Sequence, residues 1–183
     1  MNITVIGRGN VGGGLARRWE RAGHSVQALG RDGGDASSAD VVVVAVPSGT
    51  IAEALGKVTG IAGKVTIDAT NAFGGRDESF ESLAHQVKSI VGGPTAKSFN
   101  LNFASAYDEI DAQSTPPGNL YVSDDEARET VEQLIRDAGY EPVRVGGLEQ
   151  ARALEDHLPL LFAISKEHGA PVFYRYESAS PPQ

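Results

Sequence analysis

Apolar runs and stretches of helical periodicity alternate along the whole chain. The runs are short and rich in β-branched residues, which favours strands, whereas the stretches between them repeat apolar residues every three or four positions, which favours helices. The predicted strands cover residues 3–6, 25–29, 41–46, 65–68, 95–100, 120–122 and 142–145. The predicted helices cover 15–19, 50–58, 80–91, 124–138 and 148–168, and a short helical link covers 35–40. This alternation predicts an α/β fold with a mostly parallel sheet.

The run at 41–46, Val-Val-Val-Val-Ala-Val, is apolar on both faces. A strand of this kind fits the centre of a doubly wound sheet, where helices cover both sides. Pro47 ends the run at the carboxyl edge of the sheet, where open α/β sheets bind their ligands. The strand at 65–68 exits at the same edge toward Thr70 and Asn71. We therefore expect polar groups to gather along one edge of the sheet.

Length and composition predict one compact domain, because 183 residues with 40% hydrophobic content suffice for a single core. We expect this domain to span 1–177, with a long C-terminal helix, and a flexible Ser/Pro-rich tail to cover 178–183. The polar stretch 101–118 lacks periodicity, and a loop this long is typical of a functional lid or of disorder. The sequence Ser-Asp-Asp-Glu at 123–126 predicts a capping box at the start of the next helix.

The most specific chemical signal lies at the exit of the first strand. Gly7, Gly9 and Gly12 form G-x-G-x-x-G, and a helix follows directly. In a βαβ unit the first glycine permits a tight turn, the second lets the backbone approach a pyrophosphate, and the third lets helix and strand pack closely. The N–H groups and dipole of that helix favour an anion, so this context predicts a Rossmann-type dinucleotide site. The residues expected to hold the diphosphate are Gly7, Arg8, Gly9, Asn10, Val11 and Gly12.

The loop after the second strand predicts the type of dinucleotide. NAD sites place Asp or Glu about 20 residues past the glycines to hold the ribose 2′-hydroxyl, whereas this chain has Gly30 and Arg31 there. A guanidinium can pair with a 2′-phosphate, and one such contact of about 1.5–3 kcal/mol gives a roughly 10- to 150-fold preference for NADP. Asp32 keeps an alternative open, because a carboxylate turned toward the ribose would shrink or reverse this preference.

The composition excludes several classes of function. The chain has no cysteine, which rules out disulfides, thiolate metal sites and cysteine nucleophiles, and its 4 scattered histidines lack metal-ligand spacing. The net charge of −8 argues against nucleic acid or an anionic membrane as the main partner. No apolar run is long enough to span a bilayer, and the N-terminus is predicted as a core strand, so we expect a cytoplasmic protein.

Several segments, taken in order, resemble one family. Besides the glycine turn and the Gly30-Arg31 pair, they are Val43-Val44-Ala45-Val46-Pro47, Ile67-Asp68-Ala69-Thr70-Asn71, Lys97-x-Phe99-Asn100 and Gly147-Leu148-x-x-Ala151-Arg152-x-Leu154-Glu155. Over about residues 1–155 this set resembles the NADPH-dependent coenzyme F-420 reductases, the deazaflavin-dependent NADP oxidoreductase family.

The resemblance implies NADP(H) as cofactor and direct hydride transfer between C4 of the nicotinamide and C5 of the deazaflavin. Such transfer needs stacked rings and exclusion of water more than a general base, so no catalytic side chain is required. Asn100, expected near the nicotinamide, and His157, a candidate proton donor, are the side chains worth testing. The residues that the resemblance places below the nicotinamide are Val46, Pro47, Ser48, Thr70 and Asn71.

Four further side chains have simpler interpretations. Lys97 points either to the substrate or to solvent, and Asp68 is expected to cap the end of its strand rather than to hold a ribose. His24 is expected in a loop and His85 on a helix surface.

The leading hypothesis is an NADP(H)-dependent oxidoreductase that exchanges hydride with a deazaflavin (coenzyme F-420) or a flavin-like ring. Two alternatives stay open: an NADPH-dependent reductase of a small carbonyl or imine, and a non-catalytic NADP-binding sensor. An ordered lid at 101–118 that carries Phe103 and Tyr107 over the nicotinamide would favour chemistry. We expect a small-molecule redox substrate as partner, and a homodimer is compatible with the chain.

Overall fold

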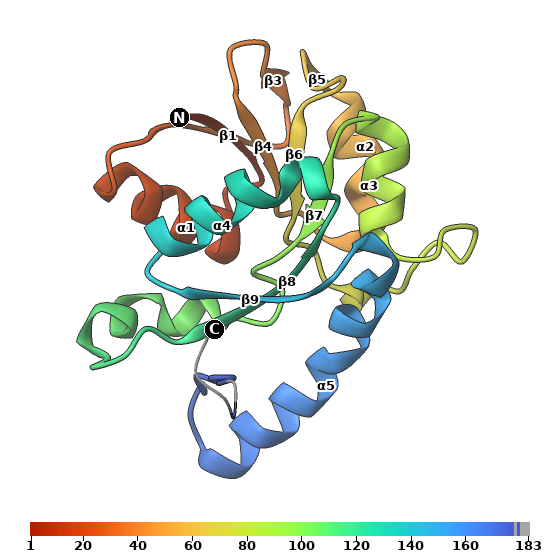
Figure 1. Ribbon diagram of the computed structural model, residues 1–183. Helices are drawn as coiled ribbons and strands as arrows, with labels where there is room; N and C mark the ends of the chain where they lie inside the picture. The colour runs from red at the N-terminus through yellow and green to blue at the C-terminus, as the bar shows by residue number, and fades with distance from the viewer. Residues whose placement is uncertain (178, 180–183) are drawn as a thin grey trace.

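The computed structural model describes residues 1–177 and 179, and within them a seven-stranded main sheet lies between layers of helices (Figure 1). In spatial order its strands are β2 (Ser25–Leu29), β1 (Asn2–Ile6), β4 (Val41–Val44), β6 (Val65–Asp68), β7 (Thr95–Lys97), β8 (Gly118–Ser123) and β9 (Glu141–Gly146). The first five strands in this order run parallel to one another. The sixth, β8, runs antiparallel to β7, and β9 runs parallel to β8. Because β2 and β4 lie on opposite sides of β1, the switch point of the sheet lies between β1 and β4.

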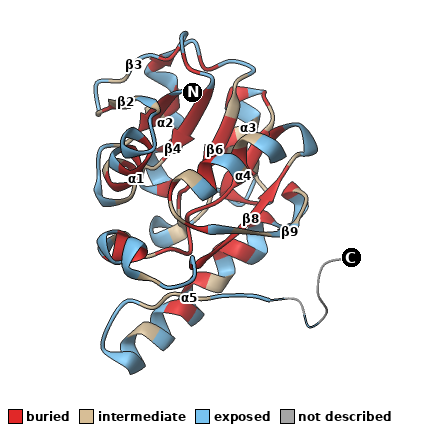
Figure 2. Cartoon of the chain, turned by 60° about the vertical axis from the view of Figure 1, so that its left-hand side comes forward, coloured by how far each residue is buried: buried red, intermediate tan, exposed pale blue. Residues whose placement is uncertain are grey.

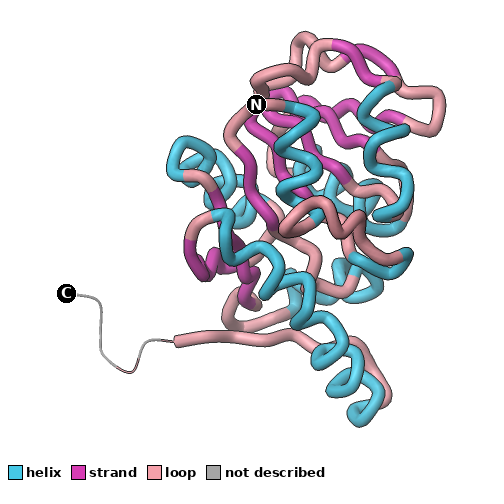
Figure 3. The backbone as a smooth tube through the Cα atoms, turned by 90° about the vertical axis from the view of Figure 1, so that its right-hand side faces the viewer, coloured by secondary structure: helices cyan, strands magenta, loops and turns pink. Residues whose placement is uncertain are grey.

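Helices cover both faces of this sheet. On one face lie α1 (Asn10–Arg21) and α4 (Arg128–Asp137), and on the other lie α2 (Ile51–Gly56) and α3 (Leu83–Val91) (Figure 1). The long helix α5 (Ala151–His168) begins beside α3 and extends beyond the sheet (Figure 3). Short 3-10 helices link these elements: η1 (Ser48–Thr50), η2 (Ala72–Gly74), η3 (Ala104–Ala112), η4 (Asp125–Ala127) and η5 (Leu148–Gln150).

Strand β4 divides the core into two halves. Its four residues, Val41–Val44, are all buried. Alternate valines pack with Trp19 on the α1 side and with Leu55 on the α2 side. In Figure 2 the buried sheet runs between helices whose outer faces are exposed. The structure therefore confirms the predicted Rossmann-type, doubly wound, mostly parallel sheet in a single compact domain with a C-terminal helix.

Two predicted strands have the expected bounds, at 25–29 and 65–68. The run at 41–46 forms a strand only to Val44, and the one at 95–100 only to Lys97. Beyond Lys97 the chain leaves the sheet through Phe99, whose φ of 63° is left-handed. This conformation is rare for a bulky residue, and here the buried ring packs edge-on against Trp19, with 5.6 Å between ring centroids.

The predicted helical link at 35–40 is wrong. β3 (Gly34–Asp35) instead pairs in parallel with β5 (Val58–Thr59), which also ends the predicted helix 50–58 at Gly56. The Asp35 carboxylate accepts hydrogen bonds from the Ser37 backbone and hydroxyl and from Thr59. This small two-stranded pairing joins segments that lie far apart in the sequence, so local periodicity does not reveal it.

The capping box predicted at 123–126 is also wrong. Ser123 is the last residue of β8, and α4 begins only at Arg128, after η4. The Asp124 carboxylate accepts hydrogen bonds from the Thr95 backbone N–H and from Lys88. The Ser123 hydroxyl, which the capping box would use, is buried in the sheet and makes no hydrogen bond within the described residues.

Within the stretch 101–118, residues 104–112 form the 3-10 helix η3. On η3, Ala106, Tyr107 and Ile110 are buried. The Tyr107 ring lies against α1 so closely that a Cβ on Gly14 would come within 2.5 Å of it. Tyr107 is thus a packing residue and does not cover the nicotinamide side of the sheet.

The C-terminal segment matches the prediction in part. Leu154, Leu158 and Leu161 of α5 are buried, whereas Phe162 is 44% exposed. After α5 the chain returns to the sheet, where the Gly118 backbone N–H donates to the Tyr174 carbonyl at 2.7 Å. The predicted flexible tail at 178–183 lies outside the described residues, except for 179.

Candidate nucleotide-binding site

The glycine turn joins β1 to α1 as the sequence predicts. Gly7 has a φ of +111°, and a Cβ there would lie 2.2 Å from the Ala45 carbonyl oxygen. A Cβ at Gly12 would lie 2.0 Å from the Gly7 carbonyl oxygen. Both positions therefore exclude side chains for reasons internal to the fold.

Gly9 differs from these two glycines. Its backbone is extended, with φ −73° and ψ −168°, and a Cβ there would meet no protein atom within 4 Å. Neither conformation nor packing requires a glycine at this position. The open space beside it is what a close approach of ligand to backbone needs.

The start of α1 offers a set of hydrogen-bond donors. The helix begins at Asn10, its N-cap Gly9 makes no side-chain cap, and its first turn carries no acidic residue. The first N–H groups of a helix have no intrahelical acceptor, so those of Asn10, Val11 and Gly12 are available to an anion. The predicted diphosphate residues thus come together at one helix terminus.

A cleft of about 900 Å³ opens beside this turn, at the carboxyl ends of β1, β2 and β4. It lies at the switch point of the sheet, where doubly wound folds bind ligands. The predicted residues that line it are Gly7, Arg8, Gly9, Gly30, Arg31, Val46 and Pro47. Sequence reasoning missed the contribution of α2 and its flanks, namely Thr50, Glu53, Ala54 and Lys57. The signal for them was the helix predicted directly after the central strand.

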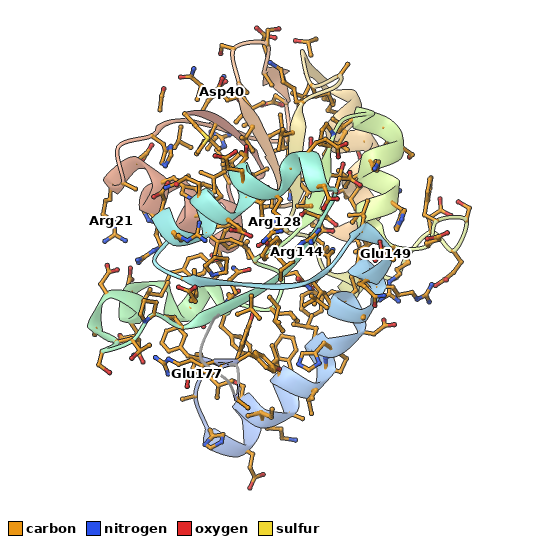
Figure 4. The ribbon with its side chains drawn as sticks, in the orientation of Figure 1. Arg21, Asp40, Arg128, Arg144, Glu149 and Glu177 are labelled. Atoms are coloured by element: carbon orange, nitrogen blue, oxygen red, sulfur yellow. The ribbon has the colours of Figure 1, made fainter. Side chains whose placement is uncertain are left out.

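Arg8 lies across the loop that follows β2. A Cβ at Gly30 would come within 2.2 Å of the Arg8 guanidinium, so the Arg8 side chain packs directly over Gly30 and would have to shift for a larger residue there. Of the arginines near the N-terminus, only Arg8 and Arg31 line the cleft. Arg18 is buried and pairs with Asp111, and Arg21, at the opposite end of α1 (Figure 4), lies 3.6 Å from the same carboxylate.

Charges of both signs surround the far end of the cleft. Lys57 donates from Nζ to the Arg31 carbonyl oxygen at 3.3 Å and to the Glu53 carboxylate at 2.6 Å. The hydrogen bond and charge of Lys57, aided by Arg31, lower the pKa of Glu53. Asp32 lines the same cleft, so both the cation and the carboxylate considered from the sequence are present there.

Further along the same edge, beyond β4, the polar groups are buried. Ser48, Thr70 and Asn100 are at most 5% exposed. The hydroxyls of Ser48 and Thr70 and the Oδ1 of Asn100 have no hydrogen-bond partner within the described part of the chain. Buried polar atoms without a partner cost free energy, so their presence together at a ligand-binding edge suits a site completed by a ligand.

Asn71 and Asn100 are held together by their side-chain amides. Asn71 Nδ2 donates to the Asn100 carbonyl oxygen at 2.8 Å, and Asn100 Nδ2 donates to Asn71 Oδ1 at 3.2 Å. Asn100 Nδ2 also lies 3.2 Å from the Leu154 carbonyl oxygen on α5. The ends of β6 and β7 and the long helix therefore fix the orientation of both amides.

Below this amide pair lies a buried ionic network. Lys97 is fully buried and donates to Asp68 at 2.7 Å and to the Thr70 carbonyl at 2.8 Å, and its ammonium lies 3.1 Å from Glu155. Glu155 also accepts from Arg76 at 2.7 Å. Lys97 thus faces neither the substrate nor solvent, contrary to both interpretations above, because two carboxylates compensate its charge inside the protein.

The Asp68 carboxylate also accepts the Thr70 backbone N–H at 2.9 Å, which confirms its predicted role as a strand-end cap.

The histidines do not converge on the site. His24 pairs with Asp137, and His85 is half-buried on α3, where it contacts Ser82. His157 is half-buried on α5, and its role stays a prediction.

Two kinds of feature are absent from the described residues. They contain no group of 3 or more His, Asp or Glu residues placed to hold a metal ion. Among their helices, none combines the length and the apolar character that crossing a membrane requires.

Comparison with known proteins shows similarity at the level of structure. No family model matches the chain, and no curated protein matches it in sequence. The crystal structure of a candidate F-420-dependent NADP reductase from Arthrobacter sp. FB24 is 21% identical, with a TM-score of 0.81, and the match covers 96% of this chain and 99% of that one. Hypothetical protein SMa0349 from Sinorhizobium meliloti is 27% identical, with a TM-score of 0.67, and the match covers 81% of this chain and 86% of that one.

A reductive aminase from Aspergillus terreus, solved with NADPH and ethyl levulinate, is 14% identical with a TM-score of 0.67. The match covers 92% of this chain but only 62% of the aminase. At these identities the similarities establish the fold, and they confirm the predicted Rossmann-type architecture.

Proposed function

We propose that this protein is an NADP(H)-dependent oxidoreductase that exchanges hydride with a deazaflavin, coenzyme F-420, or a flavin-like ring. One observation carries the dinucleotide part of the proposal. Gly9 stands at the uncapped start of α1, beside the cleft, and no contact within the protein requires a glycine there. A diphosphate bound against the backbone would explain the glycine, because a side chain at this position would block its approach.

The residues present fit NADP(H). The first-turn N–H groups of α1 would hold the diphosphate, and Arg31 at the far end of the cleft would hold the 2′-phosphate. Arg8 lies between these two places, because its guanidinium covers Gly30. The adenosine half then occupies the open cleft, and the nicotinamide half extends past β4 toward Thr70 and Asn71.

When bound, the nicotinamide supplies or accepts hydride at C4. The chain contributes orientation and exclusion of water rather than proton transfer. Asn71 and Asn100 are locked together, so their amides present fixed dipoles at the ends of β6 and β7. The Thr70 hydroxyl and Asn100 Oδ1, which have no partner among residues 1–177 and 179, would bond to the ligand, and this would remove the cost of leaving them unsatisfied.

An apolar aromatic cluster beside the amide pair supports a planar acceptor. Phe73 follows Asn71 closely, and Phe103 follows Asn100. Both contact Phe162 of α5 edge to face, with 5.7 Å and 5.4 Å between ring centroids. Phe73 is 73% exposed, so it offers aromatic surface to a ring. The similarity to the Arthrobacter protein favours a deazaflavin as that ring.

The proposal is tested by mixing the protein anaerobically with NADPH and, separately, coenzyme F-420, FMN, FAD, or a ketone with an amine. We expect NADPH oxidation coupled to reduction of the deazaflavin or a flavin. When the acceptor is the deazaflavin and the NADPH is deuterated at C4, the deuterium should appear at C5 of the acceptor. Turnover only with the ketone and amine would overturn the proposed acceptor. NADPH binding without transfer to any acceptor would identify a binding protein instead.

A further inference from the structure

Lys57 lies at the end of the cleft where the adenosine ribose is expected, although it belongs to the segment after α2. Its Nζ donates to the carbonyl oxygen of Arg31 at 3.3 Å, which places the ammonium beside the predicted 2′-phosphate residue. It also lines the cleft itself. Two of its three N–H donors have partners among the described residues, so the third is available to a ligand oxygen.

The backbone of Lys57 is fixed against the loop that carries Arg31. The Gly34 N–H donates to the Lys57 carbonyl oxygen at 3.2 Å, and the next residues pair as β3 and β5. A Cβ at Gly33 would lie 2.0 Å from the same carbonyl, and Gly33 has a φ of +75°. The two cations are therefore held as neighbours by tertiary structure, not by a chance contact of long side chains.

Glu53 is the carboxylate that both cations surround. Lys57 forms an ion pair with it at 2.6 Å, and Arg31 acts on it as a second positive charge. The Glu53 side chain is 69% exposed and that of Lys57 is 43% exposed, so solvent screens their attraction and the pair is easily exchanged. A phosphomonoester carries more negative charge than one carboxylate and offers three acceptor oxygens.

We propose that Lys57 is a second cation of the 2′-phosphate site and that Glu53 competes with the phosphate for it. This inference rests on the proposed use of NADP(H). Arg31 supplies a planar donor pair, whereas the Lys57 ammonium supplies a mobile point charge from the segment after α2. Discrimination between NADP(H) and NAD(H) then depends on the charges of Arg31, Lys57 and Glu53, which come from two separate segments. Because the Glu53 carboxylate competes with the phosphate, it limits how strongly the site can prefer NADP(H).

The test measures dissociation constants for NADPH and NADH by fluorescence titration at low ionic strength. For Lys57→Met, which keeps most of the aliphatic stem, we expect NADPH binding to weaken about 5- to 20-fold and NADH binding to change less than about 2-fold. For Glu53→Gln we expect NADPH binding to strengthen about 2- to 5-fold with NADH unchanged. Lys166→Met, on the exposed end of α5, is the matched control and leaves both constants unchanged.

The outcomes separate this inference from the proposed function. Unchanged NADPH affinity in Lys57→Met, or an equal loss for both nucleotides, overturns the role of Lys57 while NADP(H) binding stands. Weaker NADPH binding in Glu53→Gln overturns the competition. Failure of the wild-type protein to bind either nucleotide overturns the proposed function itself. Circular dichroism of each variant shows whether the fold is retained, and Lys57→Gln serves as a second variant if Lys57→Met is not folded.

Discussion

The two halves of the carboxyl edge are built in different ways. On the β2 side of the switch point, Arg8, Arg31, Lys57 and Glu53 line an open cleft, and the glycine turn offers backbone N–H groups. On the β6 and β7 side most polar groups are buried, among them Asn100 and Lys97, and Asn71 is half-buried. The first half has exposed charges that can change partners, whereas the second has fixed groups with some atoms unpaired.

This difference suggests a division of labour. Under the proposed function, the open cleft would select a phosphate without being rigid, because an exposed charge costs little to rearrange. A buried network is costly to disturb, so it can hold hydride-transfer partners in one geometry. Substitutions in the first half should therefore change affinity, and substitutions in the second should change stability.

The largest expected effect is that of Lys97→Met. Its loss leaves the buried carboxylates of Asp68 and Glu155 without their shared cation, which should lower the free energy of unfolding by about 3–5 kcal/mol. Lys57→Met, which removes an exposed ion pair, should cost at most about 1 kcal/mol. Urea denaturation of both variants compares the halves directly, and equal losses would contradict the division.

Arg31→Ala should have the next largest effect, on affinity alone. Losing one charge-assisted contact to the 2′-phosphate should weaken NADPH binding about 10- to 150-fold and spare NADH. Calorimetric titration with each nucleotide measures this, with Arg21→Ala at the far end of α1 as the control. If Arg31→Ala discriminates between the nucleotides as well as the wild type does, the 2′-phosphate lies elsewhere.

Thr70→Val should have a smaller effect on stability than Lys97→Met, and it should stabilise the protein rather than destabilise it. Because the buried Thr70 hydroxyl has no partner in the described residues, its removal should raise the free energy of unfolding by about 1 kcal/mol. NADPH binding should weaken about 3- to 10-fold if the ligand uses that hydroxyl. Thermal and urea unfolding without nucleotide check the first part, and lower stability would show that the hydroxyl is already satisfied.

Salt should have the smallest effect, and it should act differently on the two halves of the carboxyl edge. Raising the ionic strength from about 0.01 M to about 0.15 M shortens the Debye length from about 30 Å to about 8 Å. NADPH affinity should fall severalfold, and more than NADH affinity does. The destabilisation caused by Lys97→Met should stay constant, because buried charges are screened little. A salt-independent NADPH affinity would argue against exposed cations as its source.

The sequence predicts best what depends on neighbours in the chain. The strand at 65–68 and the glycine turn have local causes, namely a β-branched run and a Cβ-free turn. The link at 35–40 was mispredicted because its structure depends on pairing with 58–59. No local pattern shows that Lys97 is buried, since its compensating Glu155 lies on a distant helix.

The candidate site follows the same rule. Gly9 and Arg31 were predictable because the dinucleotide motif and its spacing are local. Lys57 was not, because only the β3–β5 pairing brings it beside Arg31. The packing of Tyr107 on α1 could not be predicted, because the sequence does not show that Gly14 leaves room for its ring.

The central claim is that a diphosphate lies against the backbone at Gly9, and Gly9→Ala tests it most directly. The added methyl group meets no protein atom within 4 Å and suits the extended backbone, so the melting temperature should not change. NADPH affinity measured by calorimetry should fall at least about 10-fold, because the methyl group occupies the space of the diphosphate. Gly56→Ala, whose Cβ also meets no atom within 4 Å, should bind NADPH like the wild type. A Gly9→Ala protein with wild-type NADPH affinity would contradict the account.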